Sequence, residues 1–191
     1  MQAAVHGQNW NASQLGASLG LSHPTINRYL DFLEGVFLRR LSPWSGNLRK
    51  RLVKSPKVYW RDTGLLHGLL GVSSVDSLLG QPWVGASWEG FVVEQILASL
   101  QTLGHRVDPS YFRSADGYEI DLVFSLAEQV WAIEIKLTTD PSPHDLARLQ
   151  KAADLIGADQ RILISQVPIS AFGERQASCN LPDFLTRLTA I

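Results

Sequence analysis

The chain has 191 residues, of which 45% are hydrophobic and 18% are charged, so it can bury a sizeable core and form one large or two small domains. We expect two domains. The single cysteine, Cys179, excludes an internal disulfide, and no Cys/His spacing fits a structural zinc site. The sequence begins without the basic and apolar regions of a secretion signal, and no apolar run is long enough to span a membrane. These features predict a cytoplasmic protein.

The charge is unevenly distributed along the chain. Residues 1–61 contain nine Lys/Arg and two acidic residues, a net charge of +7, whereas residues 62–191 contain eight Lys/Arg and sixteen acidic residues, a net charge of −8. This asymmetry suggests one surface for nucleic acid or another polyanion and one region rich in carboxylates. A chance difference between two small domains is the alternative.

Residues 11–20 have the pattern of a short helix that Gly20 ends, and Ser22 is placed to cap a second helix over about residues 23–33. Gly16 is the small residue expected where the two helices touch. The predicted inner face of the second helix consists of Ile26, Tyr29, Leu30 and Leu33. The predicted outer face, as in a recognition helix, carries His23, Thr25, Asn27 and Arg28. The pattern favours a helix-turn-helix, and a helical hairpin that only packs is the alternative.

The next segment resembles the hairpin of a winged helix, with strands at residues 36–41 and 48–53. The stretch from residue 39 to residue 61 contains no acidic residue. Its basic residues (Arg39, Arg40, Arg49, Lys50, Arg51, Lys54, Lys57 and Arg61) are interleaved with Trp44, Tyr59 and Trp60, a composition suited to phosphate contact. We expect Arg49, Lys50, Arg51 and Lys54 to bind DNA. Docking of a protein partner, or of the neighbouring domain, is the alternative.

Glycine, serine and proline residues between positions 71 and 86 predict a linker. The winged helix-turn-helix domain would then cover residues 1–70 and a second domain residues 87–191. The second domain opens with a predicted helix over about residues 87–103, in which Glu89 lies at the edge of the apolar stripe. Burying an unpaired carboxylate is costly. A metal ion or a lysine would explain Glu89, and a salt bridge to an arginine is the alternative.

The rest of the second domain alternates strands and helices. We expect strands at residues 111–113, 118–124, 130–136 and 161–165, with helices at 144–156 and 182–188. This order predicts an α/β (α+β) fold with a mixed sheet flanked by helices. Because side chains alternate along a strand, Glu134 and Lys136 share one face. Asp121 lies on the strand before them, and a solvated pair of surface charges is the alternative interpretation.

Asp121, followed by Glu134-x-Lys136 and preceded by a helical Glu89, resembles the PD-(D/E)xK nuclease fold, which is a restriction-endonuclease-like fold. The resemblance implies that Asp121 and Glu134 bind Mg²⁺ or Mn²⁺, that Glu89 assists the metal shell, and that Lys136 orients or activates the attacking water. Hard oxygen ligands suit these ions. The implied activity is that of a metal-dependent deoxyribonuclease.

The chain also resembles the C-terminal region of prokaryotic ATPases of the AAA+ superfamily, in which a winged helix and a nuclease-like domain follow the nucleotide-binding module. The segments that carry this resemblance are the basic wing and residues 58–65, 88–94, 117–123 and 132–136. The sequence contains no Gly-x-x-x-x-Gly-Lys-Ser/Thr motif, so we expect no ATP hydrolysis by that route. We therefore expect this chain to be a fragment of such an ATPase, a truncated gene product, or a stand-alone descendant of one.

Two functions from different classes follow from these patterns. The first is a DNA-associated protein with a Mg²⁺-dependent phosphodiesterase site. The second is a non-catalytic DNA-binding, docking or regulatory module whose protein partner carries the ATPase.

Overall fold

A computed structural model describes residues 6–45 and 55–190 of the chain. The chain divides into two compact units. The first comprises Met1–Leu41 and Ser55–Phe91, and the second comprises Ser42–Lys54 and Val92–Ile191. Among the described residues, no helix combines the length and apolar composition needed to cross a membrane.

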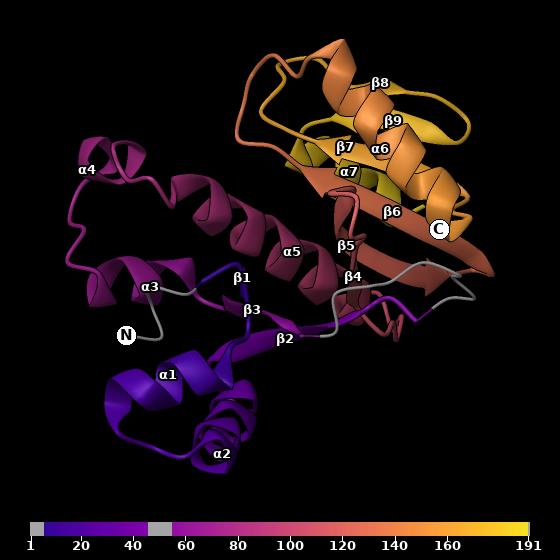
Figure 1. Ribbon diagram of the computed structural model, residues 1–191. Helices are drawn as coiled ribbons and strands as arrows, with labels where there is room; N and C mark the ends of the chain where they lie inside the picture. Colours follow the sequence, from indigo (N-terminus) through magenta and orange to yellow (C-terminus); the bar gives the residue numbers. More distant parts are fainter. Residues whose placement is uncertain (1–5, 46–54, 191) are drawn as a thin grey trace. The chain divides into compact units, whose positions relative to one another are not determined.

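The first unit combines helices with a small antiparallel sheet (Figure 1). Its strands β1 (Gln8–Asn9), β2 (Leu38–Pro43) and β3 (Lys57–Trp60) lie in the order β1-β3-β2. Residues 38–41 of β2 pair with β3 in antiparallel register. Its helices are α1 (Ala12–Leu19), α2 (His23–Glu34), α3 (Thr63–Leu69), α4 (Val75–Leu79) and the first residues of α5 (Val84–Thr102).

The predicted helix pair is confirmed, and local signals explain it. Gly20 ends α1 in the left-handed conformation, with a φ of 67°, and the Ser22 side chain accepts a hydrogen bond from the backbone N–H of Thr25 at the start of α2. Gly16 lies where the two helices meet, because a Cβ atom there would stand 2.6 Å from the carbonyl oxygen of Leu21. The turn therefore requires glycine at position 16.

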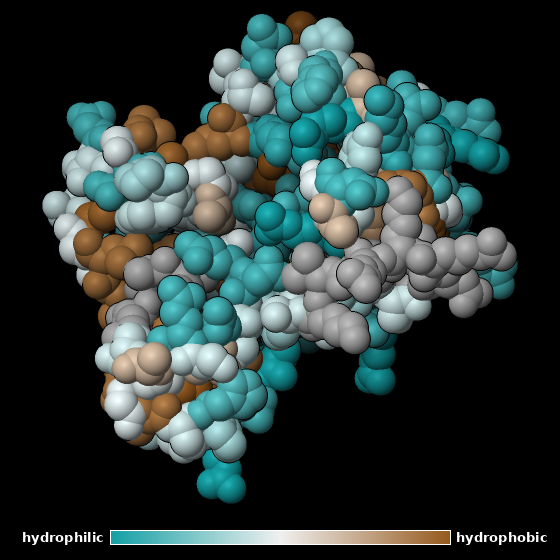
Figure 2. Space-filling model, viewed as in Figure 1, coloured by the Kyte–Doolittle hydropathy of each residue, from teal (hydrophilic) through white to brown (hydrophobic). Residues whose placement is uncertain are grey.

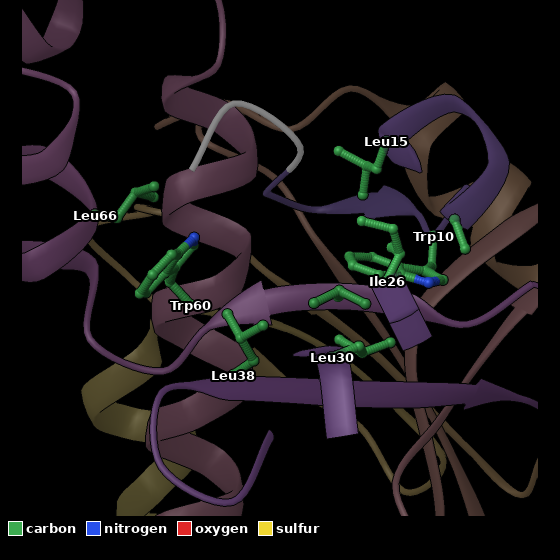
Figure 3. Packing of buried hydrophobic residues seen from close by; sticks show 9 residues of the cluster. Trp10, Leu15, Ile26, Leu30, Leu38, Trp60 and Leu66 are labelled. Atoms are coloured by element: carbon green, nitrogen blue, oxygen red, sulfur yellow. The ribbon is translucent and has the colours of Figure 1, made fainter. Parts of the chain in front are cut away.

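The core of the first unit lies between the helix pair and the sheet (Figure 3). Ile26 and Leu30 of α2 pack there with Trp10, Leu38 and Trp60. Leu33 packs partly against this cluster, as expected. Tyr29 was placed on the inner face by its spacing, and this prediction is wrong, since half of its surface is exposed.

The second unit is a mixed sheet with helices on both faces (Figure 1). Its strands are β4 (Ser110–Arg113), β5 (Glu119–Leu126), β6 (Gln129–Ile135), β7 (Gln160–Ile164), β8 (Ala171–Phe172) and β9 (Gln176–Cys179), in the order β4-β5-β6-β7-β9-β8. The end of β2 adds to β4 in parallel, through Ser42 and Pro43. The α/β class and the mixed sheet are therefore confirmed.

Helix α6 (Pro143–Ile156) covers one face of this sheet. Its residues Leu149, Ala152 and Ala153 share a buried cluster with Val123 of β5 and Ala132 of β6; Leu163 of β7 also belongs to this cluster. On the opposite face, Trp131 of β6 stacks on Phe124 and meets Phe184 of α7 (Leu181–Leu188) edge-on. The alternation of side chains along β5, β6 and β7 thus assigns each residue to the α6 face or the α7 face.

Several elements differ from the sequence-based expectation. The predicted loop between β5 and β6 is a two-residue turn, in which Ala127 and Glu128 have φ values of 50° and 61°. Strands β8 and β9 were not predicted. The predicted linker, residues 71–86, includes α4 and the start of α5. The second strand of the predicted wing, residues 48–53, lies outside the described residues, and β3 is an antiparallel partner of β2.

Candidate functional site

The two carboxylates and the lysine of the predicted site lie at one end of the β5–β6 pair. The paired residues of these strands end at Leu122 and Ile133, and Asp121 and Glu134 are the next residue on each strand. Asp121 is buried, and its Oδ2 accepts a hydrogen bond of 2.9 Å from the backbone N–H of Ile135. This bond fixes the orientation of the Asp121 carboxylate.

Lys136 follows β6 and turns back to Glu134. Its Nζ lies 2.6 Å from Glu134 Oε1, and 13% of the Glu134 side chain is exposed, against 42% of Lys136. Burial alone would lower the pKa of Lys136, but the neighbouring Glu134 carboxylate, with its hydrogen bond, and the charges of Asp121 and Asp145 raise the pKa above its ordinary value. Lys136 is therefore held as an ammonium ion beside two carboxylates.

The first turn of α6 contributes to the same electrostatic environment. Ser142 and Asp145 form a capping box, in which each side chain bonds the backbone of the other residue. The hydrogen bonds from Ser142, followed by the charge of Lys136, hold the pKa of the Asp145 carboxyl below its ordinary value, although partial burial opposes the shift. Asp145 thus adds a third negative charge that acts on Lys136.

The chemistry of this donor set fits Mg²⁺ or Mn²⁺. Within residues 6–45 and 55–190, no group of three or more His, Cys, Asp or Glu side chains could enclose a metal ion. Mg²⁺ does not require such a cage, because it usually keeps several waters and binds through one or two carboxylates. Asp121 and Glu134 would supply these oxygens, and an ion bound to Glu134 Oε1 would displace the Lys136 ammonium from that oxygen.

Glu89 has a different environment, in the first unit. Its Oε1 accepts hydrogen bonds from the Tyr59 hydroxyl and, at 2.5 Å, from the Lys57 ammonium. The side chains of Lys57 and Glu89 are 6% and 15% exposed. Of the explanations expected for this carboxylate, the lysine is the one observed. Asp121, Glu134 and Lys136 belong to the second unit, so the structure groups three of the four predicted residues.

The predicted outer face of α2 is partly confirmed. His23 and Arg28 are exposed, and Thr25 and Asn27 are half-buried. Asn27 also has a structural contact, because its Oδ1 accepts a hydrogen bond from Trp10 Nε1. Arg49, Lys50, Arg51 and Lys54 lie outside the described residues.

Three residues grouped with the basic segment are buried in the first unit. Lys57, Tyr59 and Trp60 are each less than a tenth exposed. The interpretation of these residues as a phosphate-contacting surface is therefore wrong, since β3 lies between β1 and β2 and its side chains face the unit's interior.

Two family models match the chain. A model described as a domain of unknown function (DUF8612) matches residues 1–76, and a second, also described as a domain of unknown function (DUF4143), matches residues 84–177. The chain is similar to two mycobacterial proteins, described as uncharacterized: Mb2031c of Mycobacterium bovis and Rv2008c of Mycobacterium tuberculosis. Each is 43% identical over 144 residues, which cover 74% of this chain and 32% of the relative.

The chain therefore spans about a third of the length of the curated relatives that it matches. No solved structure matches the chain. The boundary between the two matched families, between residues 76 and 84, falls close to the division of the structure at Phe91.

Sequence reasoning missed two features near these sites. Lys57 was assigned to a basic surface, although its position at the start of the apolar Val58-Tyr59-Trp60 strand could have indicated an interior ion pair. Ser165, directly after β7, was not predicted as a site residue, because a single serine at the end of a strand matches no sequence motif. Only the pairing of β7 with β6 puts Ser165 in the same ladder as Lys136.

Proposed function

We propose that this chain is a DNA-associated protein whose second unit carries a Mg²⁺- or Mn²⁺-dependent phosphodiesterase site of the PD-(D/E)xK type. The observation that carries the proposal is the grouping of Asp121, Glu134 and Lys136 at one end of the β5–β6 pair. There the charges of both carboxylates act on the Lys136 ammonium. Two oriented carboxylates beside a lysine held positive are suited to a metal ion and a phosphate group.

The roles of the protein groups follow from their contacts. The Ile135 N–H fixes the Asp121 carboxylate, which with Glu134 would hold the ion. When bound, the ion would supply a water of lowered pKa as the nucleophile and neutralise charge on the phosphate. Lys136 would donate to the phosphoryl oxygens, on which negative charge accumulates as the water attacks.

Glu89 is not included in the proposed metal set. Its carboxylate is engaged by Lys57 and Tyr59 in the first unit, where it compensates a buried ammonium. Its participation in the metal shell stays a prediction of the sequence resemblance.

The first unit would bind DNA as a winged helix. Two helices followed by two antiparallel strands, with sheet order β1-β3-β2, support this proposal, and so do the exposed His23 and Arg28 on α2. The positive charge of residues 1–61 would supply contacts to the phosphate backbone.

A second candidate, a docking or regulatory module of an ATPase, is favoured by the apolar surface of the first unit. Phe32 on α2 is 72% exposed and Val75 on α4 is 70% exposed. Figure 2 shows hydrophobic surface gathered around α3 and α4. Arg40, moreover, is neutralised by Asp31 and Glu34 of α2. DUF4143 segments are commonly found in AAA-type ATPase proteins, and this supports a partner of that class.

Cleavage of DNA separates the two candidates. We expect Mg²⁺- or Mn²⁺-dependent cleavage of single- or double-stranded DNA that Asp121→Ala and Lys136→Ala each reduce at least about a hundredfold, the loss expected for one oriented electrostatic contribution. Asp140→Ala, which removes an exposed carboxylate after β6, is the matched control. A folded wild-type protein that cleaves no DNA with either ion would favour the docking module.

A further inference from the structure

Ser165 has a buried hydroxyl with no partner among the described residues. The residue is fully buried, directly after β7, and its Oγ accepts and donates no hydrogen bond there. Its backbone N–H does have a partner, the carbonyl oxygen of Cys179 on β9, at 2.9 Å. A buried hydroxyl without a partner costs about 1–3 kcal/mol, so most buried hydroxyls in proteins have a partner and the exceptions call for an explanation.

The sheet register puts Ser165 beside Lys136. Strands β6 and β7 are parallel, with Ile135 opposite Ile164, and the Lys136 N–H donates to the Ile164 carbonyl oxygen at 2.9 Å. One residue further, Lys136 lies opposite Ser165. Neighbouring strands are about 4.8 Å apart, a distance that the four-carbon stem of a lysine spans easily.

The side chains of Ser165 and Lys136 also share one face of the sheet. Leu163 contributes to the buried cluster under α6, and Ser165 is two residues further along the same strand. Glu134 lies opposite Leu163 on the neighbouring strand, so the two side chains share a face of the sheet. Lys136 is two residues after Glu134, forms an ion pair with it, and is therefore on the same face. The Ser165 hydroxyl is thus on the α6 face, at the edge of the carboxylate–lysine site.

We propose that Ser165 is a positioning residue that accepts a hydrogen bond from the Lys136 ammonium when a metal ion takes Glu134. The inference rests on the proposed metal site. In the structure, the Lys136 ammonium is bound to Glu134 Oε1, so a cation that takes this oxygen displaces an ammonium that needs a new acceptor. The Ser165 hydroxyl is the acceptor available on the paired strand, and it would keep the ammonium at the site rather than release it to solvent.

A double-mutant cycle with Mn²⁺ as the probe tests the role of Ser165. Mn²⁺ affinity is measured by titration calorimetry for the wild-type chain, Ser165→Ala, Lys136→Met and the double variant. We expect Ser165→Ala to weaken Mn²⁺ binding about tenfold, the size of one hydrogen bond to a charged group. In the Lys136→Met background the same change should alter the affinity less than about twofold, because no ammonium remains to be accepted.

Two further variants keep the test interpretable. Ser165→Thr retains a hydroxyl and should bind Mn²⁺ within about threefold of the wild type. If Ser165→Ala fails to fold, Ser165→Cys, with a similar volume and a weak acceptor, replaces it. Asp121→Asn is the control that removes a proposed ligand and should weaken Mn²⁺ binding in both backgrounds.

The outcomes separate the positioning role from the metal site itself. Mn²⁺ binding that Ser165→Ala leaves unchanged, or weakens equally with and without Lys136, overturns the positioning role and leaves the proposed site standing. A wild-type chain that binds no Mn²⁺ at millimolar concentration overturns the metal site and the role of Ser165 together.

Discussion

The buried ion pair between Lys57 and Glu89 predicts a strong, mutually dependent effect on stability. At 2.5 Å, and with an effective dielectric constant of about 20, Coulomb's law gives a gross attraction of roughly 7 kcal/mol. The removal of both charges from water offsets most of it. Removal of one partner alone leaves a buried charge, for which the expected loss is about 3–5 kcal/mol.

Lys57→Met is the informative perturbation. It removes the ammonium that lies 2.5 Å from the buried Glu89 carboxylate and keeps the hydrogen bond from the Tyr59 hydroxyl, so the free energy of unfolding should fall by about 3–5 kcal/mol. The double variant Lys57→Met/Glu89→Gln removes both charges of the pair, and at least about 2 kcal/mol of that loss should be recovered. Urea denaturation followed by circular dichroism measures all of these values.

The exposed pair between Arg40 and Asp31 provides the control. The Asp31 side chain is 65% exposed, so Asp31→Asn should cost no more than about 1 kcal/mol. If Lys57→Met costs as little as Asp31→Asn, or if the losses of the single variants at Lys57 and Glu89 simply add, Glu89 is not the counter-ion of Lys57 and the argument is refuted.

Two other predictions concern pH and salt. Burial lowers the pKa of His6 to about 4, and the positive charge of Lys57 acts in the same direction, whereas the hydrogen bond to the Ala86 carbonyl oxygen opposes the shift. In the neutral ring Nδ1 accepts a hydrogen bond from the Trp60 N–H, and protonation of Nδ1 would break it. Because the folded pKa lies below the ordinary value, the contribution of neutral His6 to the free energy of unfolding should be fully present above about pH 6.5. It should decrease by roughly 3 kcal/mol as the pH falls to about 4. Thermal melts of the wild type and His6→Gln should show this extra decrease only in the wild type, with exposed His23→Gln as the control. The affinity for DNA should fall steeply as the salt concentration rises. Replacing Arg49, Lys50 and Arg51 by alanine should lower the slope of log affinity against log salt concentration by the equivalent of up to about three phosphate contacts. Binding that is insensitive to salt in an electrophoretic mobility assay would contradict phosphate contact.

Local signals made much of the fold predictable from the sequence. Gly20 and Ser22 mark the ends of two helices through backbone conformation and capping, which act within a few residues. The alternation in β5 and β6 likewise fixes which side chains share a face, so Glu134 and Lys136 could be paired in advance. These features depend on neighbours in the chain.

The features that were missed depend on distant residues. Strand β9, Gln176–Cys179, has only four residues without a run of large apolar side chains, and its pairing with β7 and β8 defines it. Tyr29 follows the helical spacing of Ile26, yet it is half exposed and does not belong to the buried cluster that contains Ile26. The partner of Glu89 is 32 residues earlier, on a central strand whose lysine has no polar pattern around it. Tertiary pairing, rather than local preference, decided each of these cases.

The central claim, that Asp121 and Glu134 form a metal site, is tested most directly by a crystal soaked in Mn²⁺. The account predicts an anomalous density peak bound to the carboxylates of Asp121 and Glu134, with the Lys136 ammonium moved away from Glu134 Oε1. Absence of a peak at these carboxylates, with the 2.6 Å contact between Lys136 and Glu134 intact, would contradict it.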